Sequence, residues 1–427
     1  MVVYLYETTI RIFLSSEGEN MEYTAKSEVF TDMNIYKEAL EIKDTILENR
    51  RFLHQHPELG LELPVTADFV EKKLKEMGYE TRRIGDCGIV TEIGRSGGKG
   101  ILLRADMDAL PVKEDADIDF KSVNGNMHAC GHDCHTANLL GAAQLLKNYE
   151  AELGGMVRLM FQPAEETMEG GKMMVEAGVC DGVDAALGMH VFTNISMPVG
   201  TILMTGAKSR MAAVDWFTIK IKGKGCHGAM PNSGVDPLNV MAHIHIALQA
   251  INAREIDPSD NIVLTIGQMH GGDTSNVIPG EAFMSGTIRT LKNETRAMVK
   301  ERMNAIASGI ASSFNAEAHV EYGNGCPVLS QSAEFYKDVK AALKTLEEIQ
   351  VVDMDEMGQG MISMGSEDFS YVASTVPSVF LQIAAGRPED GYQYPQHHPK
   401  ARFHEDALPV GAAVYAHTAI EWLKTGV

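Results

Sequence analysis

Hydrophobic residues recur in the first half of the chain with alternating helical and strand-like spacing. A helical pattern runs from Ile35 to His56, where Pro57 ends it, and a second runs from 67 to 77 and ends at Gly78. The elements predicted after these are strands at 89–93 and 101–104, a helix at 136–148, and strands at 156–161 and 185–189. Strands and helices that alternate at these lengths predict an α/β layer architecture around a largely buried sheet.

The pattern changes between residues 205 and 322. The predicted elements there are a strand at 216–221, a helix at 237–254, strands at 262–269 and 282–290, a helix at 295–314 and a strand at 318–322. This β-α-β-β-α-β order is the ferredoxin-like arrangement, and we interpret 205–322 as an inserted domain. Long helical patterns resume at 334–346 and 409–423, so the first domain is expected to consist of 35–204 and 323–427.

The residues before these domains, 1–34, are interpreted as an N-terminal extension. Alternating residues at 3–6 and 10–14 suggest either a short hairpin or a segment upstream of a true start at Met21. The segment lacks a basic start followed by a continuous apolar run, so no signal peptide is predicted.

Composition narrows the possible functions and locations. At 427 residues the chain exceeds the size of one ordinary core, and 44% hydrophobic residues supply ample core material. A net charge of −21 argues against nucleic acid or an anionic membrane as a partner, because both would repel the protein. No apolar run is long enough to span a bilayer, and six cysteines are too few for a disulfide framework. We therefore expect a cytoplasmic protein.

Residues 127–136, MHACGHDCHT, concentrate metal-ligating side chains. Thiolate, imidazole and carboxylate groups are the ligands of Zn²⁺ and similar ions, and a C-x-H pair such as Cys130 and His132 can direct both side chains at one ion. Further groups of this kind follow apolar runs, namely Glu165 or Glu166, His190, and His397 or His398. In open α/β sheets such positions meet at the carboxyl ends of the strands.

Five such ligands with one bridging group would hold two ions about 3.5–4 Å apart, which is a recurring hydrolytic arrangement. Consecutive glutamates in an irregular segment point in different directions, so one of Glu165 and Glu166 can bind metal while the other acts as a general base. Alternatives are a solvated acidic loop, surface imidazoles with structural cysteines, or a Cys130 nucleophile activated by His132. The nucleophile alternative leaves His190 and the glutamates without a role. We assign Cys134, His128 and His135 to packing or to support of the ligands.

Several segments match one family. They are RRFLHQHPELGLEL at 50–63, GILLRADMDALPV at 100–112, MHACGHDCHTANLLGAA at 127–143, FQPAEE at 161–166, GMHV at 188–191, GKGCHGAMPNSGVDPL at 223–238, SNVIPGEAFMSGTIRT at 275–290, MGSEDFSYV at 364–372 and HHPKARFHEDAL at 397–408. Through these segments the chain resembles the metal-dependent N-acyl amino-acid amidohydrolases, the group of hippurate hydrolase and the auxin-conjugate hydrolases. This group lies within the aminoacylase and carboxypeptidase class of metallopeptidases.

The resemblance implies a role for each matching residue. The implied metal ligands are Cys130 as the bridging group, His132, Glu166, His190 and His397, with Glu165 as the catalytic base. His397 is preferred to His398 because the family's motif has the form H-x-P. The inserted domain resembles a lid and dimerisation domain, in which His227 steadies the oxyanion and Asn276 and Arg289 bind substrate. A departure is Cys226, which replaces a small residue before His227.

The expected function is hydrolysis of N-acyl amino acids, or of similar amides that bear a carboxylate, by a homodimer with two divalent ions per subunit. Zn²⁺ or Mn²⁺ is preferred, and Co²⁺ or Ni²⁺ also suits a mixed N, O and S site. The alternatives are a dipeptidase or carboxypeptidase with the same site and, from a different class, a non-catalytic metal-binding protein.

Overall fold

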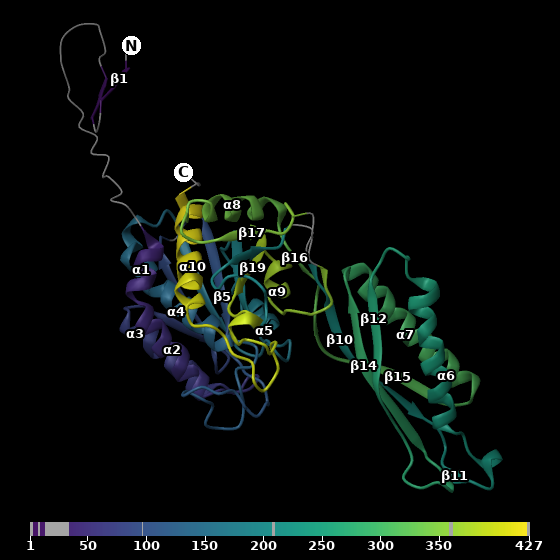
Figure 1. Ribbon diagram of the computed structural model, residues 1–427. Helices are drawn as coiled ribbons and strands as arrows, with labels where there is room; N and C mark the ends of the chain where they lie inside the picture. Colours follow the sequence, from purple (N-terminus) through teal and green to yellow (C-terminus); the bar gives the residue numbers. More distant parts are fainter. Residues whose placement is uncertain are drawn as a thin grey trace. The chain divides into compact units, whose positions relative to one another are not determined.

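The computed structural model describes residues 3–6, 9–12, 34–95, 97–206, 210–357 and 362–424 (Figure 1). They belong to two compact units, Met1–Ile35 and Tyr36–Val427. In the first unit β1 (Val3–Tyr6) pairs antiparallel with β2 (Thr9–Ile12) as a hairpin, and the remainder of the predicted strand at 10–14 lies outside the described residues. Across the described ranges, no helix combines the length and the apolar character needed to cross a membrane.

A mixed eight-stranded sheet forms the centre of the second unit. Its strands, in order across the sheet, are β17 (Val351–Asp353), β8 (Ile202–Met204), β19 (Ser378–Ala384), β7 (Ala185–Phe192), β5 (Gly100–Asp106), β6 (Met156–Gln162), β4 (Gly88–Gly94) and β3 (Thr81–Ile84). The four central strands β19, β7, β5 and β6 are parallel, so their carboxyl ends lie at one edge. The predicted α/β architecture with a large buried sheet is confirmed.

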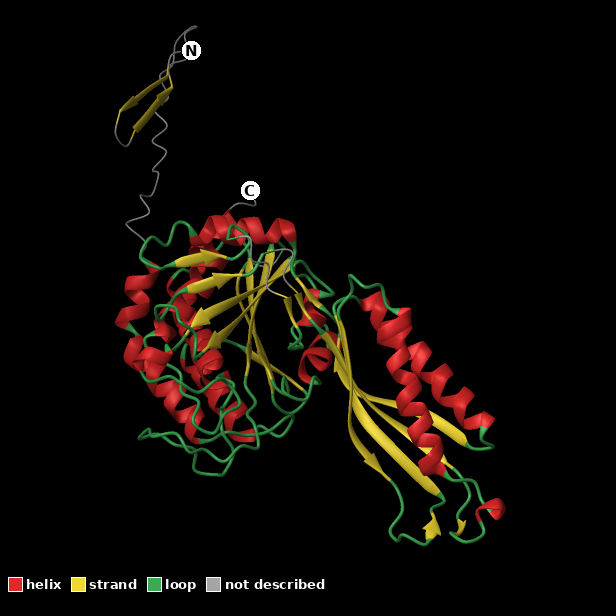
Figure 2. Ribbon diagram, turned by 45° about the vertical axis from the view of Figure 1, so that its right-hand side comes forward, coloured by secondary structure: helices red, strands yellow, loops and turns green. Residues whose placement is uncertain are grey.

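Helices cover both faces of this sheet (Figure 2). The helices packed together over one face are α2 (Lys43–Gln55), α3 (Pro64–Glu76), α4 (His132–Asn148), α8 (Ala333–Leu343) and α10 (Ala407–Lys424), with α1 (Ile35–Glu41) leading into α2. The shorter α5 (Gly170–Glu176) and α9 (Ser370–Ala373) pack against each other and the other face. Both α4 and α10 are buried along almost their whole length, which explains why their sequences are apolar or small on nearly every side.

A separate four-stranded antiparallel sheet follows β9 (Arg210–Met211). The elements in chain order are β10 (Ala213–Lys222), α6 (Pro237–Ala250), β12 (Ile262–His270), β14 (Glu281–Thr290), α7 (Asn293–Ser313) and β15 (Glu317–Cys326), and the strands lie in the order β12-β14-β10-β15. Helices α6 and α7 pack on one face of this sheet around an apolar core (Figure 2). The side chain of Asp236 caps α6 by accepting from the Leu238 and Asn239 amides.

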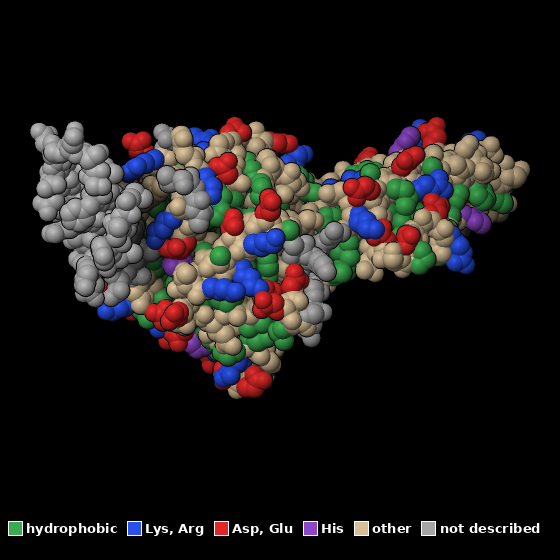
Figure 3. Space-filling model, turned by 90° about the horizontal axis from the view of Figure 1, so that it is seen from above, with side chains coloured by type: hydrophobic (Ala, Val, Ile, Leu, Met, Phe, Trp, Pro, Cys, Tyr) green, Lys and Arg blue, Asp and Glu red, His purple; other side chains and the backbone are tan. Residues whose placement is uncertain are grey.

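Short strands complete this unit. The pairs are β11 (Cys226–His227) with β13 (Val277–Ile278), and β16 (Leu329–Ser330) and β18 (Ile362–Ser363) on either side of β9. Acidic and basic side chains are interspersed on the face seen in Figure 3. The domain boundaries proposed at 204/205 and 322/323 stay a prediction.

Two element boundaries differ from the prediction and change how the site is built. Helix α4 begins at His132 and not at 136, so His132 belongs to the first helical turn and not to the preceding loop. Gly131 precedes it with a φ of 96°, a left-handed conformation that glycine adopts readily. Strand β7 continues to Phe192, so His190 lies within the strand. Polar ligand-type residues interrupt the apolar pattern at both places, which hid the element ends.

Candidate metal centre and catalytic groups

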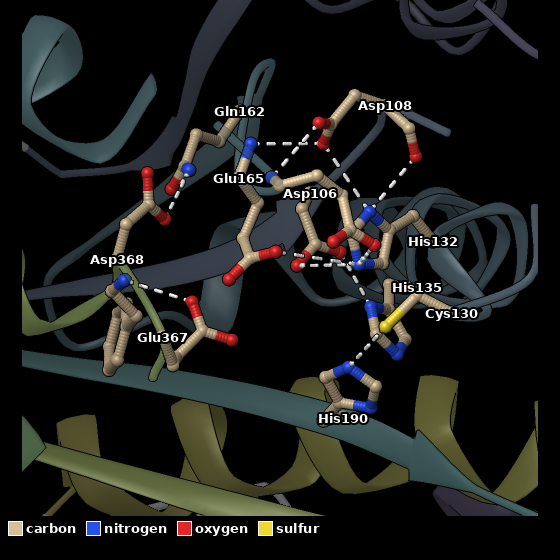
Figure 4. Close-up of polar contacts among 12 residues, drawn as sticks. Asp106, Asp108, Cys130, His132, His135, Gln162, Glu165, His190, Glu367 and Asp368 are labelled. Carbon is tan, nitrogen blue, oxygen red and sulfur yellow. Dashed lines mark hydrogen bonds and ion pairs between the residues drawn. The ribbon is translucent and has the colours of Figure 1, made fainter. Parts of the chain in front are cut away.

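The predicted ligands converge at the carboxyl edge of the central parallel strands. Figure 4 shows three of them, Cys130, His132 and His190, together with Glu165. His190 projects from β7, His132 from the first turn of α4, and Glu165 and Glu166 from the loop after β6. Cys130 stands directly before α4. The described residues contain five overlapping groups of potential ligand atoms here. Three consist of predicted site residues: Cys130, His132 and His190; Cys130, Glu166 and His397; and His132, Glu165 and Glu166. The other two are Asp106, His132 and His135, and Glu165, Glu367 and Asp368.

Backbone contacts orient two of the imidazoles toward this centre. His132 Nδ1 lies 2.9 Å from the carbonyl oxygen of Asp108, and His190 Nδ1 lies 2.7 Å from the carbonyl oxygen of Val191. A carbonyl oxygen only accepts, so each Nδ1 carries a proton, and in the neutral imidazole each Nε2 presents its lone pair. The buried Nε2 of His132 has no hydrogen-bond partner among the described residues. This orphaned acceptor fits a metal ligand.

Cys130 lies between the imidazoles of two distant segments. Its Sγ is 3.4 Å from His190 Nε2 and 3.3 Å from His397 Nε2. Sulfur and nitrogen ligands of one tetrahedral zinc ion, at about 2.3 and 2.1 Å from it, stand about 3.6 Å apart. The observed separations are close to this value on both sides of the sulfur. The Cys130 sulfur is therefore at a distance from each imidazole that suits two ligands of one ion.

Asp108 holds the backbone of the two adjacent glutamates. Its Oδ1 accepts from the Glu165 amide at 3.0 Å, and its Oδ2 accepts from the Glu166 amide at 3.1 Å. The backbone before them is unusual, because Ala164 has a φ of 55°. Glu166 Oε1 lies 3.9 Å from His132 Nε2 and 3.6 Å from His397 Nε2. Glu165 Oε2 also lies 3.9 Å from His132 Nε2, and Glu165 groups in addition with the carboxylates of Glu367 and Asp368.

The electrostatics of the site favour a bound cation. Burial raises the pKa of the Cys130 thiol well above its usual value, and it raises the pKa of the Glu166 carboxyl to about 7 against the effect of His132. Burial and the charge of Glu367 likewise raise the pKa of Glu165. These groups are thus driven toward their neutral forms by the protein alone. A divalent ion would stabilise the thiolate and carboxylate forms, so the residues present fit such an ion.

The two C-terminal histidines make different contacts. His397 reaches the Cys130 and Glu166 group, and its amide donates to the Ala129 carbonyl at 2.9 Å. His398 instead stacks on Tyr394, with ring centroids 4.4 Å apart. His397 has a φ of 66°, and backbone strain of this kind is concentrated at functional sites.

A buried arginine connects the acidic groups behind the site. Arg104 is fully buried, and its Nη1 donates to Asp106 Oδ2 at 2.7 Å. Its Nη2 donates to Glu367 Oε1 at 2.8 Å and to Asp368 Oδ1 at 3.0 Å, while its Nε donates to Gln162 Oε1 at 3.0 Å. Sequence reasoning gave these residues no role, although all lie in or beside the segments that carry the family resemblance. Asp106 and Asp108 could have been found from the sequence, because they end or follow a buried strand. Glu367 and Asp368 lie in a loop whose sequence has no periodic pattern.

His135 supports the ligands indirectly. Its Nδ1 lies 2.5 Å from Asp106 Oδ1, and its Nε2 accepts from the Val191 amide at 2.9 Å. The imidazole thereby holds the backbone beside His190. This arrangement agrees with the supporting role that we expected for His135.

The three remaining predicted residues belong to the four-stranded sheet and its loops. His227 is exposed on β11, and its Nδ1 accepts from the Ala229 amide. Asn276 is also exposed and directly precedes β13. Neither is part of the ligand groups found among the described residues. Arg289 on β14 donates from Nη1 to the Met364 carbonyl at 2.8 Å and to Ser366 Oγ at 3.2 Å, so it contacts the loop that leads into Glu367.

Comparisons with known proteins agree with this arrangement. Residues 102–421 match the model of peptidase family M20/M25/M40. The chain is 40% identical to N-acetyl-L-cysteine deacetylase of Bacillus subtilis over 84% of this chain and 83% of that protein. It is 34% identical to the IAA-amino acid hydrolase ILR1-like 2 of Arabidopsis thaliana over 97% of this chain and 93% of that protein.

A solved structure extends the likeness to three dimensions. A Bacillus subtilis protein described as a dinuclear metal binding peptidase from the M20 family superposes with a TM-score of 0.75 at 35% identity, over 90% of this chain and 99% of that one. The matches cover both the central sheet and the four-stranded sheet. The chain therefore belongs to peptidase family M20/M25/M40 and is a hydrolase of its amidohydrolase and aminoacylase group.

Proposed function

We propose that the protein hydrolyses the amide bond of N-acyl amino acids, or of similar amides that carry a carboxylate. The observation that carries this proposal is the different surroundings of two adjacent carboxyl groups that both lie 3.9 Å from His132 Nε2. Glu166 also groups with the Cys130 thiol and the His397 imidazole, while Glu165 is more deeply buried and groups with the carboxyl groups of Glu367 and Asp368. Metal storage needs ligands only, whereas a carboxylate next to the ligands but outside the set is what a general base requires.

The proposed holders of two divalent ions are Cys130, as the shared ligand, with His132, His190, Glu166 and His397. Zn²⁺ or Mn²⁺ is our first choice, and Co²⁺ or Ni²⁺ also suits this donor set. When bound, such ions lower the pKa of water and polarise a carbonyl oxygen.

Glu165 is proposed to move the proton of the reaction. It accepts a proton from the attacking water and then delivers it to the leaving nitrogen, so that one carboxyl serves as base and then as acid. Its side chain is only 8% exposed, which keeps bulk water from competing for that proton. The hydrogen bond from its amide to Asp108 fixes the position of its backbone.

The test compares two adjacent substitutions that remove the same charge. We expect Glu165→Gln to bind the full complement of metal and lose turnover by about 10²- to 10⁴-fold. Glu166→Gln should lose metal as well as activity, because it removes a ligand. Metal content by elemental analysis and turnover of a panel of N-acyl amino acids are the measurements. Retained turnover in Glu165→Gln would refute the proposed base.

The same panel decides the substrate class when dipeptides are included. Hydrolysis of acyl amino acids in preference to dipeptides supports the amidohydrolase, and the reverse preference supports the dipeptidase or carboxypeptidase alternative. The two differ in whether the substrate brings a free amine, which needs a compensating charge in the pocket.

We further propose that the four-stranded sheet, a ferredoxin-like lid, joins two subunits and that His227 and Asn276 act in the site of the partner copy, with Arg289 binding the substrate carboxylate. Support comes from the exposure of His227 and Asn276 and from the edge strand β12, whose outer side pairs with no strand in the described chain. Mixing inactive Glu165→Gln and His227→Ala proteins should then regenerate about a quarter of wild-type activity, because half of the dimers are hybrids with one intact site. A monomer in ultracentrifugation, or no recovery on mixing, contradicts the arrangement.

A further inference from the structure

We propose that Glu367 touches the substrate and accepts a hydrogen bond, through Oε2, from the nitrogen of the amide that is cleaved. This inference rests on the proposed amide hydrolysis and adds the group that recognises the leaving atom. On this proposal, Glu367 makes the protein prefer substrates whose leaving atom is an amide nitrogen over substrates whose leaving atom is an ester oxygen.

The first step of the argument is that Glu367 is held by one oxygen only. Its Oε1 accepts from Arg104 Nη2 at 2.8 Å and from the Phe369 amide at 2.9 Å. The side chain is 2% exposed, so these two donors fix it in one orientation. Within the described part of the chain, no hydrogen bond engages Oε2. Figure 4 shows the carboxyl groups of Glu367 and Glu165 facing the same space.

The second step is proximity to the proton carrier. Oxygen atoms of Glu165, Glu367 and Asp368 lie within 4.8 Å of one another. A nitrogen that receives its proton from Glu165 must come within hydrogen-bond reach of that carboxyl, and therefore close to Glu367. Asp368 is already engaged, because its Oδ1 accepts from Arg104 and Gln162 and its Oδ2 accepts from the Gly171 amide. Of the two carboxyl groups beside Glu165, Glu367 is therefore the one with an oxygen, Oε2, that can accept a hydrogen bond from the substrate.

The third step is the balance of the reaction. The water oxygen bonds to the carbonyl carbon, the carbon–nitrogen bond breaks, and the proton that Glu165 took from water passes to the nitrogen. Glu367 gains and loses no proton. It accepts from the N–H that the amide already carries, and the amine product keeps that N–H. An ester offers an oxygen at the same place, which only accepts and would face the Glu367 oxygen without a proton between them.

The substitution Glu367→Gln reverses this preference for a geometric reason. Arg104 and the Phe369 amide both donate to the Oε1 position, so the glutamine must place its oxygen there. Its NH₂ group then occupies the position of Oε2 and presents a donor to the substrate. The variant should tolerate an ester oxygen and disfavour an amide N–H.

The experiment compares an N-acyl amino acid that the wild-type protein cleaves with the matching ester, in which oxygen replaces the amide nitrogen. We expect the ratio of kcat/KM for amide over ester to fall at least about tenfold in Glu367→Gln. A matched control is Glu92→Gln on β4, whose carboxylate accepts from Arg158 at the surface and should leave the ratio unchanged. If Glu367→Gln does not fold, Glu367→Asp decides, because it keeps the charge beside Arg104 and withdraws the acceptor, so the ratio again falls.

A binding measurement separates recognition from turnover. The product amino acid and the corresponding 2-hydroxy acid are compared as competitive inhibitors, and the wild-type preference for the amino acid should disappear in Glu367→Gln. Metal content should stay at the wild-type level. Unchanged ratios in both assays overturn this inference alone, whereas failure of the wild-type protein to cleave any N-acyl amino acid overturns the proposed function and this inference with it.

Discussion

Replacing Arg104 by methionine tests whether one buried cation holds the acidic groups behind the site together. Methionine has a similar length but no charge and no donor, so Asp106, Glu367 and Asp368 lose their shared partner at a position with no solvent exposure. Breaking a buried ion pair by removing one partner costs about 3–5 kcal/mol. We therefore expect the unfolding equilibrium constant to rise by about 10²- to 10⁴-fold, measured by urea denaturation of wild type and variant at equal metal content.

The stability that Arg104→Met loses should depend on pH in a predictable direction. In the wild type, burial acts to raise the pKa of Asp106, but Arg104 and two histidines outweigh it and hold that pKa well below the usual value. A depressed folded-state pKa contributes stability above the unfolded pKa of about 3.9 and loses it as the pH falls. Without Arg104, only the two histidines oppose burial, so the folded-state pKa of Asp106 rises relative to wild type. The variant is therefore destabilised at neutral pH, and protonation of Asp106 at lower pH reduces that loss. The stability gap between the two proteins should narrow between pH 7 and pH 5.

The matched control for this experiment is Arg158→Met. Arg158 is also largely buried, but its only carboxylate partner among the described residues is Glu92, whose side chain is 51% exposed. We expect a smaller loss of about 1–2 kcal/mol with little dependence on pH. A loss below about 1 kcal/mol in Arg104→Met, or one equal to that of the control, would refute the idea that the buried network depends on Arg104.

Three further predictions concern the metal site and the packing beside it. His397→Ala should lower the bound metal measured by elemental analysis, whereas His398→Ala should not, since His398 stacks on a tyrosine outside the ligand groups; equal losses would contradict the assignment. Gly411→Ala should destabilise the protein by about 1–3 kcal/mol in urea, because the added carbon would lie 2.3 Å from Asn138 Nδ2 between α10 and α4, while Gly309→Ala on α7 meets no atom within 4 Å and should be neutral or stabilising. Chelation should lower the melting temperature and re-addition of Zn²⁺ should restore it, with about 2.7 kcal/mol regained at a free metal concentration 100 times Kd; an unchanged melting temperature would argue against a resident ion.

Local periodicity predicted strands β4, β5, β6 and β7 of the central sheet and the longer helices, because an apolar pattern can be recognised within a few turns of chain. It did not predict the other four strands of that sheet, which are β3, β8, β17 and β19. The strand at 101–104 and the helix at 409–423 were recognised from apolar residues alone, and the structure extends them by a few residues to β5 and α10. The metal-ligating residue types could also be recognised from the sequence, because Cys130 and His132 are two residues apart and such a pair is rarely required for packing alone.

Only the tertiary structure decided which of these groups meet. The motif already favoured His397, and the structure adds the proximity of its imidazole to Cys130 and Glu166. The grouping of Glu165 with Glu367 and Asp368 joins segments that are far apart in the sequence. The contact of Glu367 with Arg104 joins residues 263 positions apart. Sequence spacing reports neighbours along the chain, whereas ligation and buried charge pairing depend on distances of a few ångströms set by strand order and loop geometry.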